Sequence, residues 1–398
     1  MRDPIALELR FSAHNYHPLP VVLTRGEGVY LWDEDGRRYL DMMSAYSAVS
    51  FGHAHPRIVA ALTNQAATLA VTSRAFHTNR LGSFLQRLCE LAKQDKALPM
   101  NTGAEAVETA LKAARKWGHK VKGIPDGMAE IVTCAGNFHG RTTAVVGFSS
   151  ESQYKDGFGP FAPGFRQIPF GDATALEAVI TPNTAAFLVE PIQGEAGIIT
   201  PPVGYLAECA RICRRNRVLL LCDEVQTGLG RTGRFLASEH ENVQPDGVIV
   251  GKALGGGMLP VSAFLARNEV MEVFTPGDHG STFGGNPLAA AVGLEALNVL
   301  VEENLCERAA ELGAYLLERL REIDSPLIKD VRGKGLLIGV EVDRAITSAR
   351  HVCERLTQRG ILTKDTHGTV LRFAPPLVIA EEQIDWAVGE IRATFAEM

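Results

Sequence analysis

The chain has 398 residues, of which 46% are hydrophobic and 22% charged, and its formal net charge is −6. This length predicts two domains or one elaborated large domain, and the composition is that of an ordinary globular protein. The small excess of acidic residues gives no reason to expect nucleic acid or membrane partners, and no apolar run approaches the length of a membrane span. The seven cysteines lie scattered in mostly apolar stretches, which excludes the dense disulfide framework of a small secreted domain.

The cysteines and the first residues bear on metal binding and on the compartment. Cys209 and Cys213 share one face of a predicted helix, and Cys222 lies on the strand that follows. A metal site is one interpretation, but no histidine or second CxxC motif completes a ligand set, so we expect buried free thiols and no metal. The first residues contain neither an apolar signal core nor a basic transit segment, which favours a cytoplasmic protein.

The first part of the chain is predicted to form a small antiparallel sheet and then helices. Alternating runs over residues 21–43 are separated by Gly-containing turns, as in a meander of strands. Helices are expected over about 56–70 and 80–93. A third helix opens at Gly103 and carries an apolar stripe. The free N–H groups and the dipole at such a start favour a phosphate site.

Residues 130–266 alternate strands with helices, which predicts a doubly wound, mostly parallel sheet. Residues 151–172 show no period and are expected to form a long ordered loop. Ligands of such sheets collect beyond the carboxyl ends of the strands. Strands are expected over 130–134, 185–189, 218–222, 248–250 and 261–266, and helices over about 173–179 and 203–216.

Two of these strand ends carry an acid and an amine. The run 218–222 ends in Asp223, and the run 248–250 ends in Gly251 and Lys252, so both charged side chains would project into one crevice. Pyridoxal phosphate needs a lysine that forms a Schiff base with its aldehyde, and an acid beside its ring nitrogen. The alternative is a pair of solvated charges at strand ends, which are common.

The last third of the chain is predicted to be helical and then to form a small α+β unit. The helical pattern has a break near 302–305, and Arg372 lies on the last strand. The expected elements are helix over 286–323, strand 335–342, helix 349–359, strand 369–373 and a final helix from Glu381.

Motifs spread along the chain, from about His14 to the final helix, resemble those of the class III pyridoxal-phosphate-dependent aminotransferases. A dispersed set in one order is far more specific than any single motif. The segments, in order, are AHNYHPLP, MNTGAEA, GNFHGRT, VEPIQGEAG, DEVQTGLGRTG, GKALGGG, HGSTFGGNP, VRGKGLL and RFAPPL.

The resemblance implies an α/β protein of fold type I that forms a homodimer or a dimer-based oligomer. A large, mostly parallel sheet domain over residues 51–290 would bind the cofactor. A smaller α+β domain would be built from both chain ends, with residues 1–50 as its N-terminal part and residues 291–398 as a linking helix and its C-terminal part.

The resemblance also assigns roles to single residues. Lys252 and Asp223 would be catalytic, Lys252 as the covalent attachment point and proton carrier and Asp223 as partner of the ring nitrogen. Two positions depart from the family pattern and would change the pocket shape, because His139 stands where Trp is usual and Ala104 replaces a larger apolar residue. The implied cofactor-binding residues are Gly103, Ala104, Phe138, Asp223, Gln226, Lys252 and, from the neighbouring subunit, Thr282. The implied substrate-binding residues are Tyr16, Tyr46, Arg141 and the switch pair Glu195 and Arg372.

The activity that the resemblance implies is transfer of the δ-amino group of L-ornithine to 2-oxoglutarate, giving glutamate 5-semialdehyde and glutamate. Acetylornithine, 4-aminobutyrate or lysine are the alternative donors. Tyr16 and Tyr46 favour ornithine because they offer hydroxyls to a substrate that is polar at both ends, although packing alone would also explain two tyrosines. A cofactor-binding homologue without turnover is a further alternative, and a nucleotide-binding protein is weaker because neither GxGxxG nor GxxxxGK[ST] occurs where a strand enters a helix.

Overall fold

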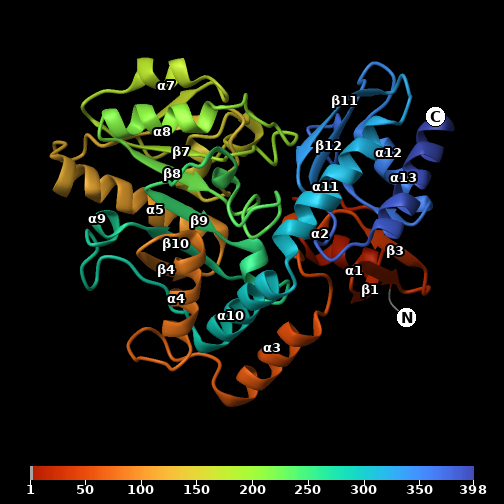
Figure 1. Cartoon of the computed structure of the whole chain (residues 1–398), viewed down its shortest axis with the longest axis horizontal. Coiled ribbons are helices and arrows are strands. Elements are labelled where there is room, and N and C mark those ends of the chain that lie inside the picture. Colours follow the sequence, from red (N-terminus) through yellow and green to blue (C-terminus); the bar gives the residue numbers. More distant parts are fainter. Residues whose placement is uncertain (1–2) are drawn as a thin grey trace.

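A seven-stranded sheet forms the centre of the molecule in the computed structural model, which describes residues 3–398 (Figure 1). Strands β9, β8, β7, β5 and β6 run parallel, whereas β10 is antiparallel to both of its neighbours, β9 and β4. Apolar runs without alternation explain why the inner strands are buried on both faces. In spatial order the strands are β4 (Lys96–Met100), β10 (Ser262–Ala266), β9 (Gly247–Val250), β8 (Leu219–Asp223), β7 (Thr184–Val189), β5 (Glu130–Cys134) and β6 (Phe165–Ile168).

Helices cover both faces of this sheet, as predicted for a doubly wound fold (Figure 1). Helix α5 (Gly103–Trp117) packs its apolar stripe on one face, and its start is fixed by a capping box between Thr102 and Glu105. Helices α7 (Ala173–Val179) and α8 (Tyr205–Arg215) pack on the other face, where the thiols of Cys209 and Cys213 are buried and unpaired, as expected.

Of three longer helices, one, α10 (Pro287–Glu302), packs on the 3₁₀ turn η4 (Lys252–Gly255), which follows β9. The other two, α3 (Pro56–Thr68) and α4 (Leu81–Ala92), pack on α10. Helix α10 ends at the predicted break, and α11 (Leu305–Arg321) begins after it. The remaining short helices are α6 (Thr143–Gly147) and α9 (Asn268–Met271), with single turns at Gly118–Lys122, Ser152–Tyr154 and Ala237–Glu241.

Two four-stranded sheets lie away from the large sheet (Figure 1). The first joins both parts of the chain, because the predicted N-terminal meander β1 (Leu23–Glu27), β2 (Tyr30–Asp33) and β3 (Arg38–Asp41) adds β13 (Ile361–Leu362) in parallel to β3. The second is antiparallel, with order β11 (Ile328–Lys334), β12 (Leu337–Val342), β15 (Val370–Phe373) and β14 (Lys364–Thr366). Helix α12 (Ala349–Gln358) packs on β13, β14 and β15, and α13 (Glu381–Ala396) packs on α11 and α12. The predicted domain boundaries stay a prediction.

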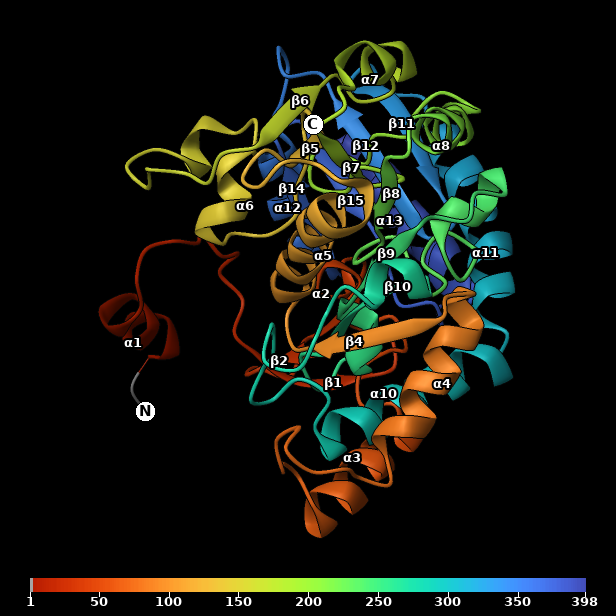
Figure 2. The ribbon, with the colours of Figure 1, turned by 90° about the vertical axis from the view of Figure 1, so that its left-hand side faces the viewer.

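Several elements were not predicted from the sequence. The stretch 151–172, expected to be a loop, contains strand β6 at the edge of the sheet, where the half-exposed Phe-Arg-Gln-Ile sequence carries no clear alternation. Strands β4, β11, β13 and β14 and helix α1 (Pro4–Phe11) are also additional. Figure 2 shows α1 apart from the rest of the chain, and none of its residues is buried. Within residues 3–398, no helix has both the length and the apolar character that crossing a membrane requires.

Candidate active site

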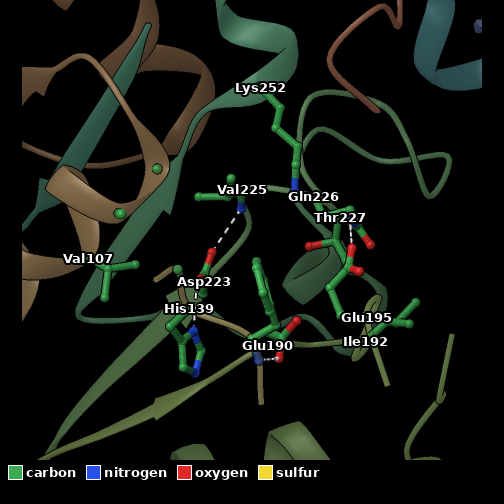
Figure 3. A pocket seen from close by; sticks show the side chains of 14 residues that line it. Val107, His139, Glu190, Ile192, Glu195, Asp223, Val225, Gln226, Thr227 and Lys252 are labelled. Atoms are coloured by element: carbon green, nitrogen blue, oxygen red, sulfur yellow. Dashed lines mark hydrogen bonds and ion pairs between the residues drawn. The ribbon is translucent and has the colours of Figure 1, made fainter. Parts of the chain in front are cut away.

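A cavity of about 190 Å³ lies at the carboxyl ends of β7, β8 and β9, where ligands of parallel sheets are expected (Figure 3). Strand β8 ends in Asp223, and η4 begins with Lys252 directly after β9. The structure therefore brings these two residues into one site, as the sequence predicts. The full lining is Gly103, Ala104, Val107, Phe138, His139, Gly140, Glu190, Ile192, Glu195, Asp223, Val225, Gln226, Thr227 and Lys252.

The amine of Lys252 extends into the cavity from a residue with a left-handed backbone, at φ 45° (Figure 3). Burial is the largest influence on this amine and lowers its pKa, although the nearby carboxylates of Glu195 and Asp223 oppose the change. The neutral form of the amine, which is the form that reacts with carbonyl groups and accepts protons, is therefore favoured more than in an exposed lysine.

Asp223 is held in place by two hydrogen bonds at the floor of the cavity. The Nδ1 atom of His139 lies 2.7 Å from its Oδ2, and the backbone N–H of Val225 donates to its Oδ1 at 3.1 Å. His139 is fully buried; burial lowers its pKa, but Asp223 outweighs that influence and the net pKa is raised. Sequence reasoning treated His139 only as a change of pocket shape and missed this contact. The available signal was that both residues follow strands at the same edge of the sheet.

Glu190, at the end of β7, is a second buried acid that sequence reasoning did not assign to the site. Its Oε2 accepts a hydrogen bond from the backbone N–H of Phe138 at 3.0 Å. Burial raises the pKa of Glu190 to about 7, with Asp223 adding to the rise and His139 opposing it. The carboxyl group thus titrates near neutral pH while it fixes the backbone of an aromatic residue that faces the cavity.

Glu195 and Arg372 form the predicted ion pair. Arg372 is 2% exposed, and its Nη1 lies 2.8 Å from Oε1 of Glu195. The amide of Gln226 donates to the same oxygen at 3.2 Å. Burial alone would raise the pKa of Glu195, but Arg372 overrides it and brings the pKa to about 2. Gly194 allows this packing, because a Cβ there would lie 1.5 Å from Oε1 of Gln226.

Tyr46 reaches the same pair from an unusual backbone segment, the turn α2 (Ser44–Ser47). Its ring centroid lies 5.1 Å from Cζ of Arg372. The residues of this turn have φ values of 50°, 45°, 60° and 75°, although none is glycine. The left-handed conformation costs a residue other than glycine about 1–2 kcal/mol, so four such residues in a row need support from the surrounding structure.

Five predicted site residues lie outside the cavity lining: Tyr46 and Arg372, which are described above, and Arg141, Tyr16 and Thr282. Arg141 is exposed, with Cζ 3.7 Å from the ring centroid of Tyr154 and 5.5 Å from that of Phe138. Tyr16 is 76% exposed and lines, with Tyr46, a second cavity of about 520 Å³. Thr282 is exposed as well. Tyr154, which stacks on the Arg141 guanidinium, is a neighbour that sequence reasoning missed.

The cavity fits pyridoxal phosphate by the chemistry of its polar groups. An amine and a hydrogen-bonded acid face it, and Oε1 of Gln226 is buried with no hydrogen-bond partner among residues 3–398. The start of α5 supplies first-turn N–H groups that have no acceptor within a helix. There is little room for a side chain at Gly103, because a Cβ atom there would lie 3.0 Å from Cγ1 of Val225.

Residues 11–395 match the family described as Aminotransferase class-III. The chain belongs to the class-III aminotransferases, which depend on pyridoxal phosphate. It is 57% identical to an ornithine aminotransferase from Geobacillus sp. (strain WCH70), over 98% of this chain and 98% of that protein. An ornithine aminotransferase from Toxoplasma gondii, with PLP partially occupying its active site, has a TM-score of 0.97 at 46% identity and covers 99% of this chain and 93% of that one.

An acetylornithine aminotransferase from Elizabethkingia anophelis is also similar, with a TM-score of 0.90 at 49% identity, covering 99% of this chain and 98% of that one. The family, the fold class and the cofactor predicted from the sequence are confirmed. The roles of the single residues stay predictions.

Proposed function

We propose that this chain transfers the δ-amino group of L-ornithine to 2-oxoglutarate. The products are glutamate and glutamate 5-semialdehyde, which cyclises to pyrroline-5-carboxylate. The observation that supports this most is the Glu195–Arg372 pair beside Tyr46, at the cavity that holds Lys252. The 57% sequence identity to an ornithine aminotransferase, over 98% of this chain, supports the same donor.

When bound, pyridoxal 5'-phosphate supplies an electron sink for negative charge at the substrate carbon. Asp223 would keep the ring nitrogen protonated, and the His139 contact keeps the Asp223 carboxylate oriented. Phe138 would stack on the ring, and Gln226 would contact its phenolic oxygen. The phosphate would lie at the N–H groups of Gly103 and Ala104, with Thr282 of the partner subunit beside it.

Lys252 is proposed to hold the cofactor covalently and then to carry a proton. When it is not bonded to the cofactor, the Nζ atom of Lys252 would take the proton from the reacting substrate carbon and later return one. This task requires a neutral amine near physiological pH, which the burial of Lys252 favours.

The two substrates are proposed to present their carboxylates to different arginines. Ornithine offers its distal amine, so its α-carboxylate lies away from the reacting centre, at Arg141. 2-Oxoglutarate needs a second cation close to that centre, and Arg372 can serve once it leaves Glu195. During the ornithine half-reaction the Glu195 carboxylate keeps Arg372 occupied. Arg372 then does not draw the α-carboxylate of ornithine inward, which would present the α-amine in place of the δ-amine.

We also propose a homodimer and a cytoplasmic location. Thr282 is exposed in this chain, as a residue that serves a partner's site would be. Helix α1 exposes Ile5, Leu9 and Phe11, and such apolar exposure suits contact with a second copy. The seven unpaired thiols suit a reducing compartment.

A panel of amino donors tests the proposal. The purified protein with pyridoxal 5'-phosphate and 2-oxoglutarate receives ornithine, acetylornithine, 4-aminobutyrate or lysine at equal concentrations, and glutamate and the carbonyl product are measured. Ornithine should give the highest kcat/KM and yield pyrroline-5-carboxylate. Acetylornithine is the strongest competitor, because the relative from Elizabethkingia anophelis is an acetylornithine aminotransferase. A higher kcat/KM for acetylornithine would show that it, and not ornithine, is the donor. Absence of turnover with every donor would favour a silent homologue.

A further inference from the structure

The left-handed turn Ser44–Ser47 is held at its N-terminal side by a buried carboxylate. Oδ1 of Asp41 accepts hydrogen bonds from the backbone N–H groups of Met43 at 2.9 Å and Ser44 at 2.8 Å. Its other oxygen lies 2.8 Å from Nε2 of His53, and Asp41 is 3% exposed. Asp41 therefore accepts the backbone N–H groups at the point where the chain enters the left-handed conformation.

A buried guanidinium supports the other side of the turn. The hydroxyl of Ser50 donates to the carbonyl of Ser47 at 3.0 Å and accepts from Nη2 of Arg231, also at 3.0 Å. Arg231 is fully buried, and its Nη1 donates to the carbonyls of Leu336 and Pro375. Burial is the main influence on Arg231 and lowers its pKa to about 9, while Asp41 opposes this.

Both ends of the turn are also joined to the chain that carries Arg372. The N–H of Ala374 donates to the carbonyl of Met42 at 2.7 Å, and the N–H of Leu377 donates to that of Ser50 at 2.8 Å. The turn is thus fixed against the residues directly after Arg372, and within it Tyr46 lies over the Arg372 guanidinium.

We propose that Asp41 and Arg231, the latter through Ser50, are positioning residues that hold Tyr46 over Arg372 by maintaining the left-handed turn. Neither residue lines the cavity that holds Lys252, although Asp41 lines the second cavity together with Tyr46. Their proposed effect on donor selection therefore passes through the position of Tyr46. This inference rests on the proposed function for its kinetic consequence, because Tyr46 matters most for a donor with a polar group at its unreacting end.

The test uses the holoenzyme with the variants Ser50→Ala and Asp41→Ala. Asp41→Asn is the conservative variant, because its amide oxygen can still accept the two N–H bonds. Thr394→Val is the matched control: Thr394 is fully buried in α13, and its hydroxyl donates to the carbonyl of Glu390 at 2.8 Å, so a similar hydrogen bond is removed elsewhere.

Amide hydrogen exchange reports the turn directly. The N–H groups of Tyr46, Ala48 and Val49 donate to carbonyls within the segment 43–45, and they should exchange at least about tenfold faster in Ser50→Ala and Asp41→Ala. In Asp41→Asn and Thr394→Val their exchange should match the parent. Unchanged exchange in both Ser50→Ala and Asp41→Ala overturns the proposal.

Single-turnover kinetics add the functional consequence. In Ser50→Ala the ornithine half-reaction should slow by about fivefold, while the glutamate half-reaction stays within about twofold of the parent. Equal slowing of both halves would make Ser50 a merely structural residue and refute the positioning role. If the parent itself does not use ornithine, the proposed function fails, and the exchange measurement alone still decides whether the network holds the turn.

Discussion

Replacing Glu195 by Gln tests how one site serves two substrates, and the structure sets the size of the effect. Arg372 is the main reason why the pKa of Glu195 is about 2 and not its ordinary 4.5. That difference corresponds to about 3 kcal/mol in favour of the charged carboxylate. The Glu195 side chain is 26% exposed, and Lys252 and Gln226 also lower its pKa. We therefore assign about 1–2 kcal/mol of this free energy to Arg372.

The Glu195→Gln substitution would keep the shape of the side chain and remove the charge that occupies Arg372. The freed guanidinium would draw the α-carboxylate of ornithine inward, so the ornithine half-reaction should slow by about tenfold. The glutamate half-reaction should be unchanged or faster, and α-amine transfer should rise relative to δ-amine transfer. Because Glu195 in the parent stays charged well below neutral pH, the effect should be the same from about pH 6 to 8.

Stopped-flow absorbance of the holoenzyme, mixed with ornithine alone or glutamate alone, gives the two half-reaction rates. Glu177→Gln is the matched control, because Glu177 pairs with Arg215 at the surface, where both side chains are 49% exposed. This control should leave both rates unchanged, since surface pairs contribute only about 0–1 kcal/mol. Equal slowing of both half-reactions by Glu195→Gln would refute the switch and leave Glu195 a structural residue.

Further substitutions test the other assignments. Lys252→Ala should abolish turnover but still admit the cofactor without a covalent bond; repeated turnover by the purified variant would remove Lys252 from its role. Asp223→Ala should slow proton removal from the substrate by far more than the loss of its packing would explain. A wild-type rate in stopped flow would mean that another acid pairs with the ring nitrogen. Tyr46→Phe should lose about 1 kcal/mol in kcat/KM for ornithine and less for donors without its α-amino group, whereas equal losses would indicate packing. The raised pKa of Glu190 stabilises the folded state fully below about pH 4.5, and this stabilisation is lost as pH rises through 7. In urea unfolding, the free energy of unfolding of Glu190→Gln minus that of the parent should therefore increase by about 2 kcal/mol from pH 5.5 to pH 8. The same difference at both pH values would contradict the buried titration.

The centre of the site was predictable because local signals and fold geometry agree there. Apolar runs that end in Asp223 and Lys252 place both side chains at one edge of a parallel sheet, wherever the intervening helices lie. Thr102 before Gly103 likewise predicts the start of α5, since the threonine hydroxyl caps the helix. Such features depend on a few neighbouring residues, and the sequence shows those directly.

The unpredicted features depend on contacts between distant residues. Strand β4 contains Pro99 and only two buried residues, and it forms because β10 offers it a partner. The left-handed turn at Tyr46 has no glycine to indicate it, and tertiary hydrogen bonds select its conformation. Arg231 is charged and would be expected at the surface, yet backbone carbonyls from another part of the chain surround it.

The pairing of β13 with β3 has a consequence for the order in which the chain folds. Arg37, just before β3, donates to the carbonyl of Gln358, which lies 321 residues further along the chain. While the protein is being synthesised, the edge of β3 therefore stays unpaired until almost all of the chain has left the ribosome. An open strand edge is a template for pairing with other chains. A chain that stops before Ile361 would lack the strand that closes this edge, and its nascent or truncated forms should be the most aggregation-prone species of this protein.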